Sequence, residues 1–377
     1  MTHEQPFPEL RAQVRELCAE FPDEYWRARD QAREYPQAFV DALTRSKLLA
    51  ALIPAAYGGL GLSLTEASVI MEEINRSGGH SAACHAQMYT MGAVLRHGSE
   101  AQKQAYLPAI ASGGLRLQAF SITETQAGSD TKRIQTTARR EGDEYVIDGH
   151  KNWTSRIEQS DLLLLLARTS EDGLSLFLID LRGVPAEALE VTPVRTMFNY
   201  ATNQVRYRDL RVPASSLIGE EGQGFRYVID GWNAERILLA AEAIGDGYWF
   251  TERATAYANA REVFGRPIGA NQGVQFPIAH AYMQVRAADM MRYEAARLFD
   301  AHEPCGAEAN MAKLLSSEAS WAAANACLDT HGGNGFVADH DVERKFRETR
   351  LYKVAPVNNN LVTSFVATKV LGLPRSY

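Results

Sequence analysis

The sequence predicts an α+β protein, because a region of short strand-like segments separates two longer helical regions. Residues up to about 112 show helix-like spacing of apolar side chains, and a glycine pair at 113–114 then opens a region of alternating pattern. The helical pattern returns after the glycines at 222–224. We therefore expect an N-terminal helical domain (1–117), a middle β-domain (118–222) and a C-terminal helical domain (223–377).

The N-terminal region carries two kinds of helical signal. Residues 24–27 and 40–43 have the apolar spacing of helices. Ser63 and Glu66 form the Ser-x-x-Glu pattern of a capping box, which opens a helix. The glycine-rich stretch at 57–61 precedes this cap, and we expect it to connect two helices.

The middle region shows the two-residue period of strands. Leu115, Leu117 and Ala119 alternate with polar residues directly after the glycine pair. Further short strands are expected at 145–149, 162–166, 176–179 and 205–207. A run of strands between two helical regions indicates a separate small β-domain.

The C-terminal region is expected to contain long helices. Four side chains fall on one helical face: Ile237, Ala241, Ile244 and Tyr248. Residues 308–328 are rich in alanine, and Gly332 and Gly333 follow at the place where glycine ends many helices.

The composition is that of an ordinary globular protein. Hydrophobic residues make up 46% of the 377 residues and charged residues 23%, which excludes a largely disordered chain. The 39 basic and 46 acidic side chains give a formal net charge of −7. Because no basic cluster stands out, we expect no nucleic-acid partner.

Neither a membrane anchor nor a metal site is expected. The longest aliphatic runs, 48–53 and 162–167, are far shorter than the roughly 20 residues of a transmembrane helix. The first residues lack the pattern of a secretory signal. The four cysteines are scattered, without a Cys-x-x-Cys pair or a nearby histidine at metal-ligand spacing. A cytoplasmic protein without disulfides is therefore expected.

Four local sequences indicate more than a fold class. The sequence AFSITETQAGSD at 119–130 and the sequence DGHKNWTS at 148–155 resemble the flavin-contacting segments of the acyl-CoA dehydrogenase family. REVFGR at 261–266 resembles that family's subunit-interface segment, and HGGNGF at 331–336 its C-terminal glycine signature. These segments occur in the family's order and at its spacing. The resemblance implies a small β-barrel or sandwich in the middle and a four-helix bundle at the C-terminus.

The resemblance also implies an FAD cofactor. A flavin needs polar groups along its rim and an apolar wall on its face, and the β-domain segments offer both. Within the chain, the resemblance assigns cofactor contacts to Phe120, Ile122, Thr123, Ser129, Trp153, Ser155, Asn358 and Asn360. Gly332 and Gly333 would let the backbone approach the pyrophosphate of a neighbouring subunit's cofactor, because a Cβ would block this approach.

A homo-oligomer, either a tetramer or at least a dimer, follows from the same comparison. In the family, the residues that correspond to Arg261, Phe264 and Gln272 approach the cofactor of a neighbouring subunit. An alternative for Arg261 is a solvated position at a helix end.

Trp153 and Ser155 are expected to share one face of a strand, because a single residue separates them. On that face an indole could stack against the flavin while a hydroxyl reaches its N5 atom. The alternative is that Trp153 is a core residue of the β-domain.

The implied reaction is α,β-dehydrogenation of an acyl thioester on coenzyme A or an acyl-carrier protein. A base removes the α-proton while a hydride passes from the β-carbon to the flavin, and an electron-transfer flavoprotein reoxidises the flavin. Most members of the family carry this base as a glutamate near the C-terminus. Pro356 stands there in this chain, and proline has neither a carboxylate nor a backbone N–H.

Glu235 is the candidate base. The isovaleryl-CoA and long-chain dehydrogenases place their glutamate on a different helix, directly before an arginine, and Glu235-Arg236 matches that position. The alternative is an exposed helical carboxylate paired with a nearby cation. The resemblance assigns substrate contacts to Ser129, His85, Tyr89, Asn233 and Arg236. The polar or bulky side chains of His85 and Tyr89 favour a short, branched or functionalised acyl group. The alternative is that core packing or surface exposure explains these residues.

Two other functions are compatible with these segments. A flavoprotein of the same fold could carry out desulfinase or nitroalkane-oxidase-like chemistry, since Pro356 removes an amide from the usual site. A flavin-binding protein that no longer turns over and contacts DNA is the other alternative. The net charge of −7 and the presence of a candidate base both count against it.

Overall fold

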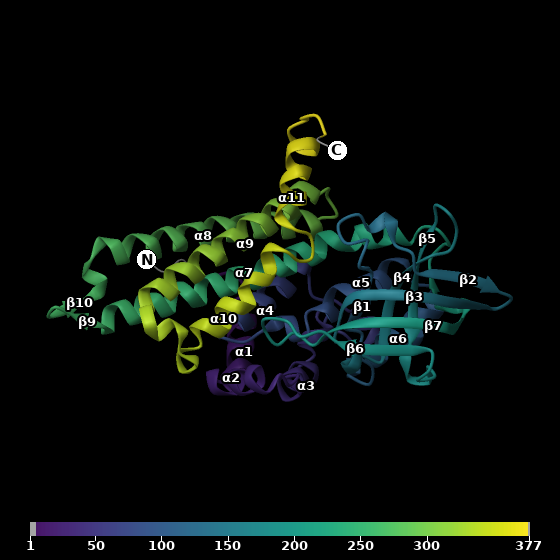
Figure 1. The fold of residues 1–377 in the computed structure, drawn as a ribbon, viewed down its shortest axis with the longest axis horizontal. Coiled ribbons are helices and arrows are strands. Elements are labelled where there is room, and N and C mark those ends of the chain that lie inside the picture. The colour runs from purple at the N-terminus through teal and green to yellow at the C-terminus, as the bar shows by residue number, and fades with distance from the viewer. Residues whose placement is uncertain (1–4, 376–377) are drawn as a thin grey trace. The chain divides into compact units, whose positions relative to one another are not determined.

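The computed structural model describes residues 5–375. Along the chain, helices come first, the strands of a sheet follow, and helices return after them (Figure 1). This arrangement confirms the predicted α+β class. Backbone contacts divide the chain into two compact units. We call them the helical unit, which contains the residues up to Glu34, Ser63–Ser81 and the residues from Asn233 on, and the sheet unit, which contains Tyr35–Leu62 and Ala82–Trp232.

The two units do not follow the order of the chain. Helices of the N-terminal third divide between them, so that each unit combines stretches that are distant in sequence. The boundaries at 117 and 222 remain a prediction about the sequence.

The helical unit is built on three long helices, of which α7 begins in the sheet unit. The helices of this unit are α1 (Pro8–Ala19), α2 (Asp23–Ala32), α4 (Leu64–Arg76), α7 (Gly224–Ala260), α8 (Gln272–Asp300), α9 (Gly306–His331), α10 (Val342–Thr349) and α11 (Asn359–Phe365). Figure 1 shows α7, α8 and α9 running alongside one another. Their shared core contains Ile244 and Tyr248 of α7, Val285 of α8 and Ala323 of α9. The apolar face predicted for α7 is buried in this core or beside it.

The predicted capping box opens α4. The Ser63 hydroxyl accepts a hydrogen bond from the Glu66 amide at 3.2 Å, and the Glu66 carboxylate accepts one from the Ser63 amide at 2.9 Å. Both contacts satisfy amides that the first turn of a helix leaves without partners.

The sheet unit holds a mainly antiparallel sheet and the helices α3 (Gln37–Arg45), α5 (Ala86–His97) and α6 (Glu100–Ser112). Its strands are β1 (Ala119–Ser121), β2 (Thr137–Glu141), β3 (Glu144–Ser155), β4 (Leu162–Arg168), β5 (Leu174–Asp180), β6 (Leu189–Pro193), β7 (Thr202–Pro213) and β8 (Leu217–Ile218). The strand order is β6-β7-β3-β2-β4-β5-β8, and β1 pairs in parallel with β4. The core of the sheet includes Tyr145, Leu163, Phe177 and Val205.

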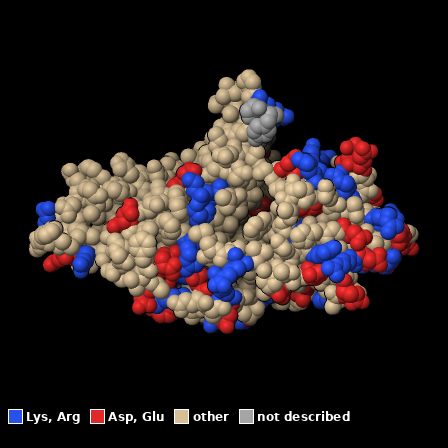
Figure 2. All heavy atoms as spheres, in the orientation of Figure 1, with Lys and Arg blue, Asp and Glu red and all other residues tan. Residues whose placement is uncertain are grey.

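Surface charge is mixed on the face of the molecule drawn in Figure 2, where basic and acidic side chains lie interspersed. Within residues 5–375, none of the helices combines the length and the apolar character that crossing a bilayer would require.

Candidate functional site

The segment after β1 is held by a buried ion pair. The Lys151 amine lies 2.9 Å from a Glu124 carboxylate oxygen and donates to the Ile122 carbonyl at 2.7 Å. The Glu124 carboxylate also accepts the amides of Gln135 at 2.6 Å and Thr136 at 2.9 Å. Burial raises the pKa of Glu124, but Lys151 and these hydrogen bonds outweigh it and lower the pKa to about 2. The ionised Glu124 carboxylate thereby connects the start of this segment to its end at Gln135 and Thr136.

The predicted cofactor residues of this segment lie at or near the surface. Phe120, Ile122 and Thr123 are partly exposed, and Ser129 is exposed. The Thr123 carbonyl accepts the Asn152 amide at 2.8 Å, so β3 and this segment are joined next to Trp153.

A bulge in β3 separates the environments of Trp153 and Ser155. The pairing register with β7 shifts between Lys151 and Thr154, and Trp153 has a positive φ of 63°. The Trp153 side chain is 59% exposed, whereas Ser155 is buried and its hydroxyl lies 2.9 Å from the hydroxyl of Thr202. The prediction of a shared strand face is therefore wrong, because the bulge breaks the alternation. The alternative of a core tryptophan is also wrong.

His85 and Tyr89 are close together in the sheet unit. Their rings lie 5.5 Å apart between centroids, and His85 Nε2 lies 3.3 Å from the Tyr200 hydroxyl. His85 is buried. The structure thus brings both predicted acyl-pocket residues into one aromatic and polar cluster.

The candidate base lies on α7 in the helical unit. Glu235 and Arg236 are each only 8% exposed, so the alternative of an exposed helical carboxylate is wrong. An Arg236 guanidinium nitrogen donates to the Asn233 side-chain oxygen at 3.3 Å. Burial lowers the pKa of Arg236, and the negative charge of Glu235 opposes that shift.

The segment around Pro356 is attached to α9 by a buried lysine. The Lys313 amine donates to the Val357 carbonyl at 2.5 Å and to the Asn359 side chain at 2.8 Å. Burial is the main cause that lowers the pKa of Lys313 to about 7, and Arg236 adds to the shift. Sequence reasoning missed Lys313, because nothing in the alanine-rich pattern of this helix marked it.

Asn358 and Asn360 have different roles in this segment. The Asn358 side-chain oxygen caps α11 by accepting the Leu361 amide at 3.0 Å, and Asn360 is exposed. Cofactor contacts of either residue stay a prediction.

The interface segment presents its side chains outward. Arg261, Phe264 and Gln272 are exposed, and Phe264 occupies a left-handed position between the short strands β9 (Glu262–Val263) and β10 (Arg266–Pro267). At Gly332 and Gly333, an added Cβ would meet no atom of the chain within 4 Å. Backbone at this turn is therefore accessible to a ligand.

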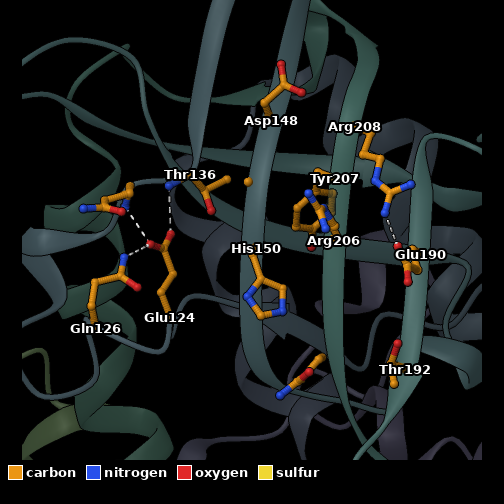
Figure 3. A pocket seen from close by; sticks show the side chains of 13 residues that line it. Glu124, Gln126, Thr136, Asp148, His150, Glu190, Thr192, Arg206, Tyr207 and Arg208 are labelled. Carbon is orange, nitrogen blue, oxygen red and sulfur yellow. Dashed lines mark hydrogen bonds and ion pairs between the residues drawn. The ribbon is translucent and has the colours of Figure 1, made fainter.

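A separate open pocket of about 710 Å³ lies on the sheet between strands β3, β6 and β7 (Figure 3). Asp148 and His150 come from β3, Glu190 from β6 and Arg206 from β7. None of the residues that the sequence predicted for the site lines this pocket. Its wall does include Glu124, the carboxylate that anchors the segment after β1.

Sequence reasoning also missed Arg156, which directly follows the flavin-like segment at 148–155. It is a buried cation of the sheet unit and contacts Tyr200. Its position next to Ser155 was the signal that could have found it.

Models of three parts of one family match this chain. The N-terminal domain of acyl-CoA dehydrogenase matches residues 7–114, the middle domain 119–210 and the C-terminal domain 222–370. Together these matches cover most of the chain and confirm the predicted family.

Individual relatives agree with these matches. The acyl-CoA dehydrogenase FadE12 of Mycobacterium bovis is 34% identical over 98% of this chain and 96% of its own length. The cyclohex-1-ene-1-carbonyl-CoA dehydrogenase of Syntrophus aciditrophicus is 31% identical over 92% of this chain and 84% of its own length. A glutaryl-coenzyme A dehydrogenase solved with glutaryl-CoA has a TM-score of 0.93 and 28% identity, and the match covers 100% of this chain and 98% of that one.

Proposed function

Because this chain belongs to the acyl-CoA dehydrogenase family, whose members oxidise a CH–CH bond of acyl-CoA, we propose that Glu235 is its catalytic base and FAD its cofactor. The reaction would convert an acyl-CoA thioester to its α,β-unsaturated product. The α-proton would move to the Glu235 carboxylate, and the two electrons of the β-C–H bond would leave with a hydride.

The observation that carries this proposal is the burial of Glu235 in a chain that has proline at the usual base position. Pro356 offers no proton acceptor, whereas Glu235 is 8% exposed on α7 and precedes a buried arginine. A positioned carboxylate can accept the proton of a carbon next to a thioester, which Pro356 cannot do.

The residues present fit a flavin. Trp153 offers an exposed indole beside the Thr123 backbone, and Ser155 offers a hydroxyl two residues further along β3. Gly332 and Gly333 leave open space beside their backbone, which suits the pyrophosphate of a neighbouring subunit's cofactor. When bound, FAD would supply the hydride acceptor. Trp153 and Ser155 would hold and orient it, together with Phe120, Ile122 and Ser129.

The assembly and the electron partner follow from the family resemblance. Exposed Arg261, Phe264 and Gln272 would contact the cofactor of a second copy, which makes the active form a tetramer or at least a dimer. An electron-transfer flavoprotein would reoxidise the cofactor.

Glu235→Gln tests the base. The variant keeps the shape and hydrogen bonding of the side chain but cannot accept the α-proton. We expect it to bind FAD and acyl-CoA while anaerobic bleaching of the flavin slows by roughly 10²–10⁴-fold. Glu242→Gln, a change of another buried α7 glutamate, is the matched control for burial alone. Bleaching of Glu235→Gln at the parent rate would exclude Glu235 as the base and favour other flavin chemistry, which peroxide release without an added acceptor would reveal.

A further inference from the structure

Arg156 is a buried cation of the sheet unit. The side chain is 3% exposed, and one guanidinium nitrogen donates to the Ala82 carbonyl at 2.6 Å. Within residues 5–375, no Asp or Glu forms an ion pair with it. A charged group buried without a counter-charge is costly, and proteins usually compensate it with a carboxylate or a phosphate.

Tyrosine side chains lie near Arg156. The guanidinium carbon lies 5.0 Å from the centre of the Tyr200 ring, and Tyr89 and Tyr35 also act on its charge. Burial lowers the pKa of Arg156, but these tyrosines outweigh it and raise the pKa above its usual value. The guanidinium therefore keeps its charge.

Two hydrogen-bond donors of this neighbourhood have no acceptor among the residues that the structure describes. They are the Nε of Arg156 and the amide nitrogen of Gln118, both fully buried. Gln118 belongs to the same cluster because its oxygen accepts the Tyr35 hydroxyl at 2.9 Å. Both unsatisfied groups are donors, so the missing partner is an acceptor, and the positive charge of Arg156 favours an anionic one.

The place of Arg156 in the fold indicates which part of a substrate would reach it. Arg156 follows Ser155, which we assign to the flavin, and its partner Tyr200 contacts His85 of the proposed acyl pocket. We propose that Arg156 binds a carboxylate at the far end of the acyl group, so that the substrate is the mono-thioester of a short dicarboxylic acid. This inference rests on the proposed function and deepens it.

A purely structural role would give Arg156 a different signature. If Arg156 only connected Ala82 and Tyr200, its replacement would change kcat/KM for acidic and neutral acyl groups alike. As a carboxylate-binding residue, it affects the acidic acyl group selectively. The ratio of kcat/KM values for two substrates of equal carbon number therefore separates the two roles.

The first experiment compares glutaryl-CoA with pentanoyl-CoA on the FAD-loaded enzyme, with succinyl-CoA and butyryl-CoA as a second pair. We expect the parent to favour the acidic member of at least one pair by roughly 10- to 100-fold in kcat/KM. Arg156→Met should abolish this preference, and Arg156→Lys should keep part of it. Arg182→Met, a change of an exposed arginine of the same unit, should keep the parent ratio.

A second measurement uses binding, because its result does not depend on turnover. Equilibrium dialysis of Glu235→Gln protein should show tighter binding of the acidic thioester, and this preference should disappear when Arg156→Met is added.

If no thioester bleaches the flavin but the binding preference is present, the proposed function fails and the role of Arg156 stands. A parent enzyme that favours neutral acyl groups in both pairs, or an Arg156→Met variant that retains the ratio, would overturn the inference. Should Arg156→Met fail to fold, the parent ratio and the Lys variant still decide it.

Discussion

Trp153 and Ser155 are close in sequence, but a bulge in β3 places their side chains in different environments. The register shift between Lys151 and Thr154 turns the indole outward and the hydroxyl inward. The indole is then free to stack against a ligand, whereas the Ser155 hydroxyl is shared with Thr202 at 2.9 Å. Alternation along an ideal strand could not produce this combination.

Ser155→Ala tests the flavin contact of this hydroxyl. We expect the variant to retain the fold, with a loss of about 1 kcal/mol in the free energy of unfolding, because a buried hydrogen bond to Thr202 is lost. If Ser155 reaches the flavin, the visible absorption bands should shift and anaerobic reduction should slow. Thr202→Val removes the same hydrogen bond but keeps the Ser155 hydroxyl, so it should disturb the spectrum less. Equal spectra in all three proteins would place Ser155 away from the flavin.

At the scale of elements, α9 fixes the segment that precedes α11. The Lys313 amine binds the Val357 carbonyl and the Asn359 side chain, and Asn359 in turn donates to Glu318 of α9 at 2.9 Å. These contacts hold the backbone on both sides of Asn358, close after Pro356. A buried amine thus stabilises the segment that contains Pro356.

The stability of the protein should depend on pH through Lys313. Its folded-state pKa of about 7 lies below the ordinary value of 10.5, owing first to burial and then to Arg236, while Glu318 opposes and Lys353 adds to the shift. Between these values the unfolded chain holds the proton more tightly, so this group makes the free energy of unfolding rise as pH increases from about 7 to 10.5.

Lys313→Met should remove that rise. Urea unfolding at pH 7 and at pH 9.5 should show that the variant loses stability relative to the parent as pH increases. The free energy of unfolding of the parent rises at the higher pH, because burial of the Lys313 amine favours its neutral form. The methionine of the variant does not titrate, so it adds no such rise. Parallel stability curves of parent and variant across this range would contradict the assignment.

At the scale of the whole molecule, the hairpin of β9 and β10 carries an apolar side chain on its surface. Phe264 is fully exposed and sits at a positive φ of 54°. The ring is therefore available for contact with another molecule. The family resemblance names a second copy of the chain, with its cofactor, as that molecule.

Phe264→Ala should therefore weaken both assembly and cofactor retention. We expect the parent to elute as a dimer or tetramer in size-exclusion chromatography and the variant to shift toward monomer and to lose FAD on dilution. Leu60→Ala, a change of an exposed apolar side chain in the sheet unit, should alter neither property. A parent protein that is a colourless monomer, and that cannot be reconstituted with FAD, would contradict the proposed assembly and cofactor.

The sequence alone determined the features that depend on neighbouring residues. The capping box at Ser63, the strand at 162–166 and the apolar face of α7 were all predicted, because a short stretch of chain decides each of them. The family was also readable, since its signature segments are local and occur in order.

Only the tertiary structure decided the environment of each site residue. Burial of Glu235 depends on elements that pack around α7, and exposure of Trp153 depends on the register of β3 against β7. The contacts of Arg156 with Ala82 and Tyr200 join segments that are distant in the sequence. Residue spacing does not encode such contacts, because burial and pairing result from the packing of segments far apart in the chain.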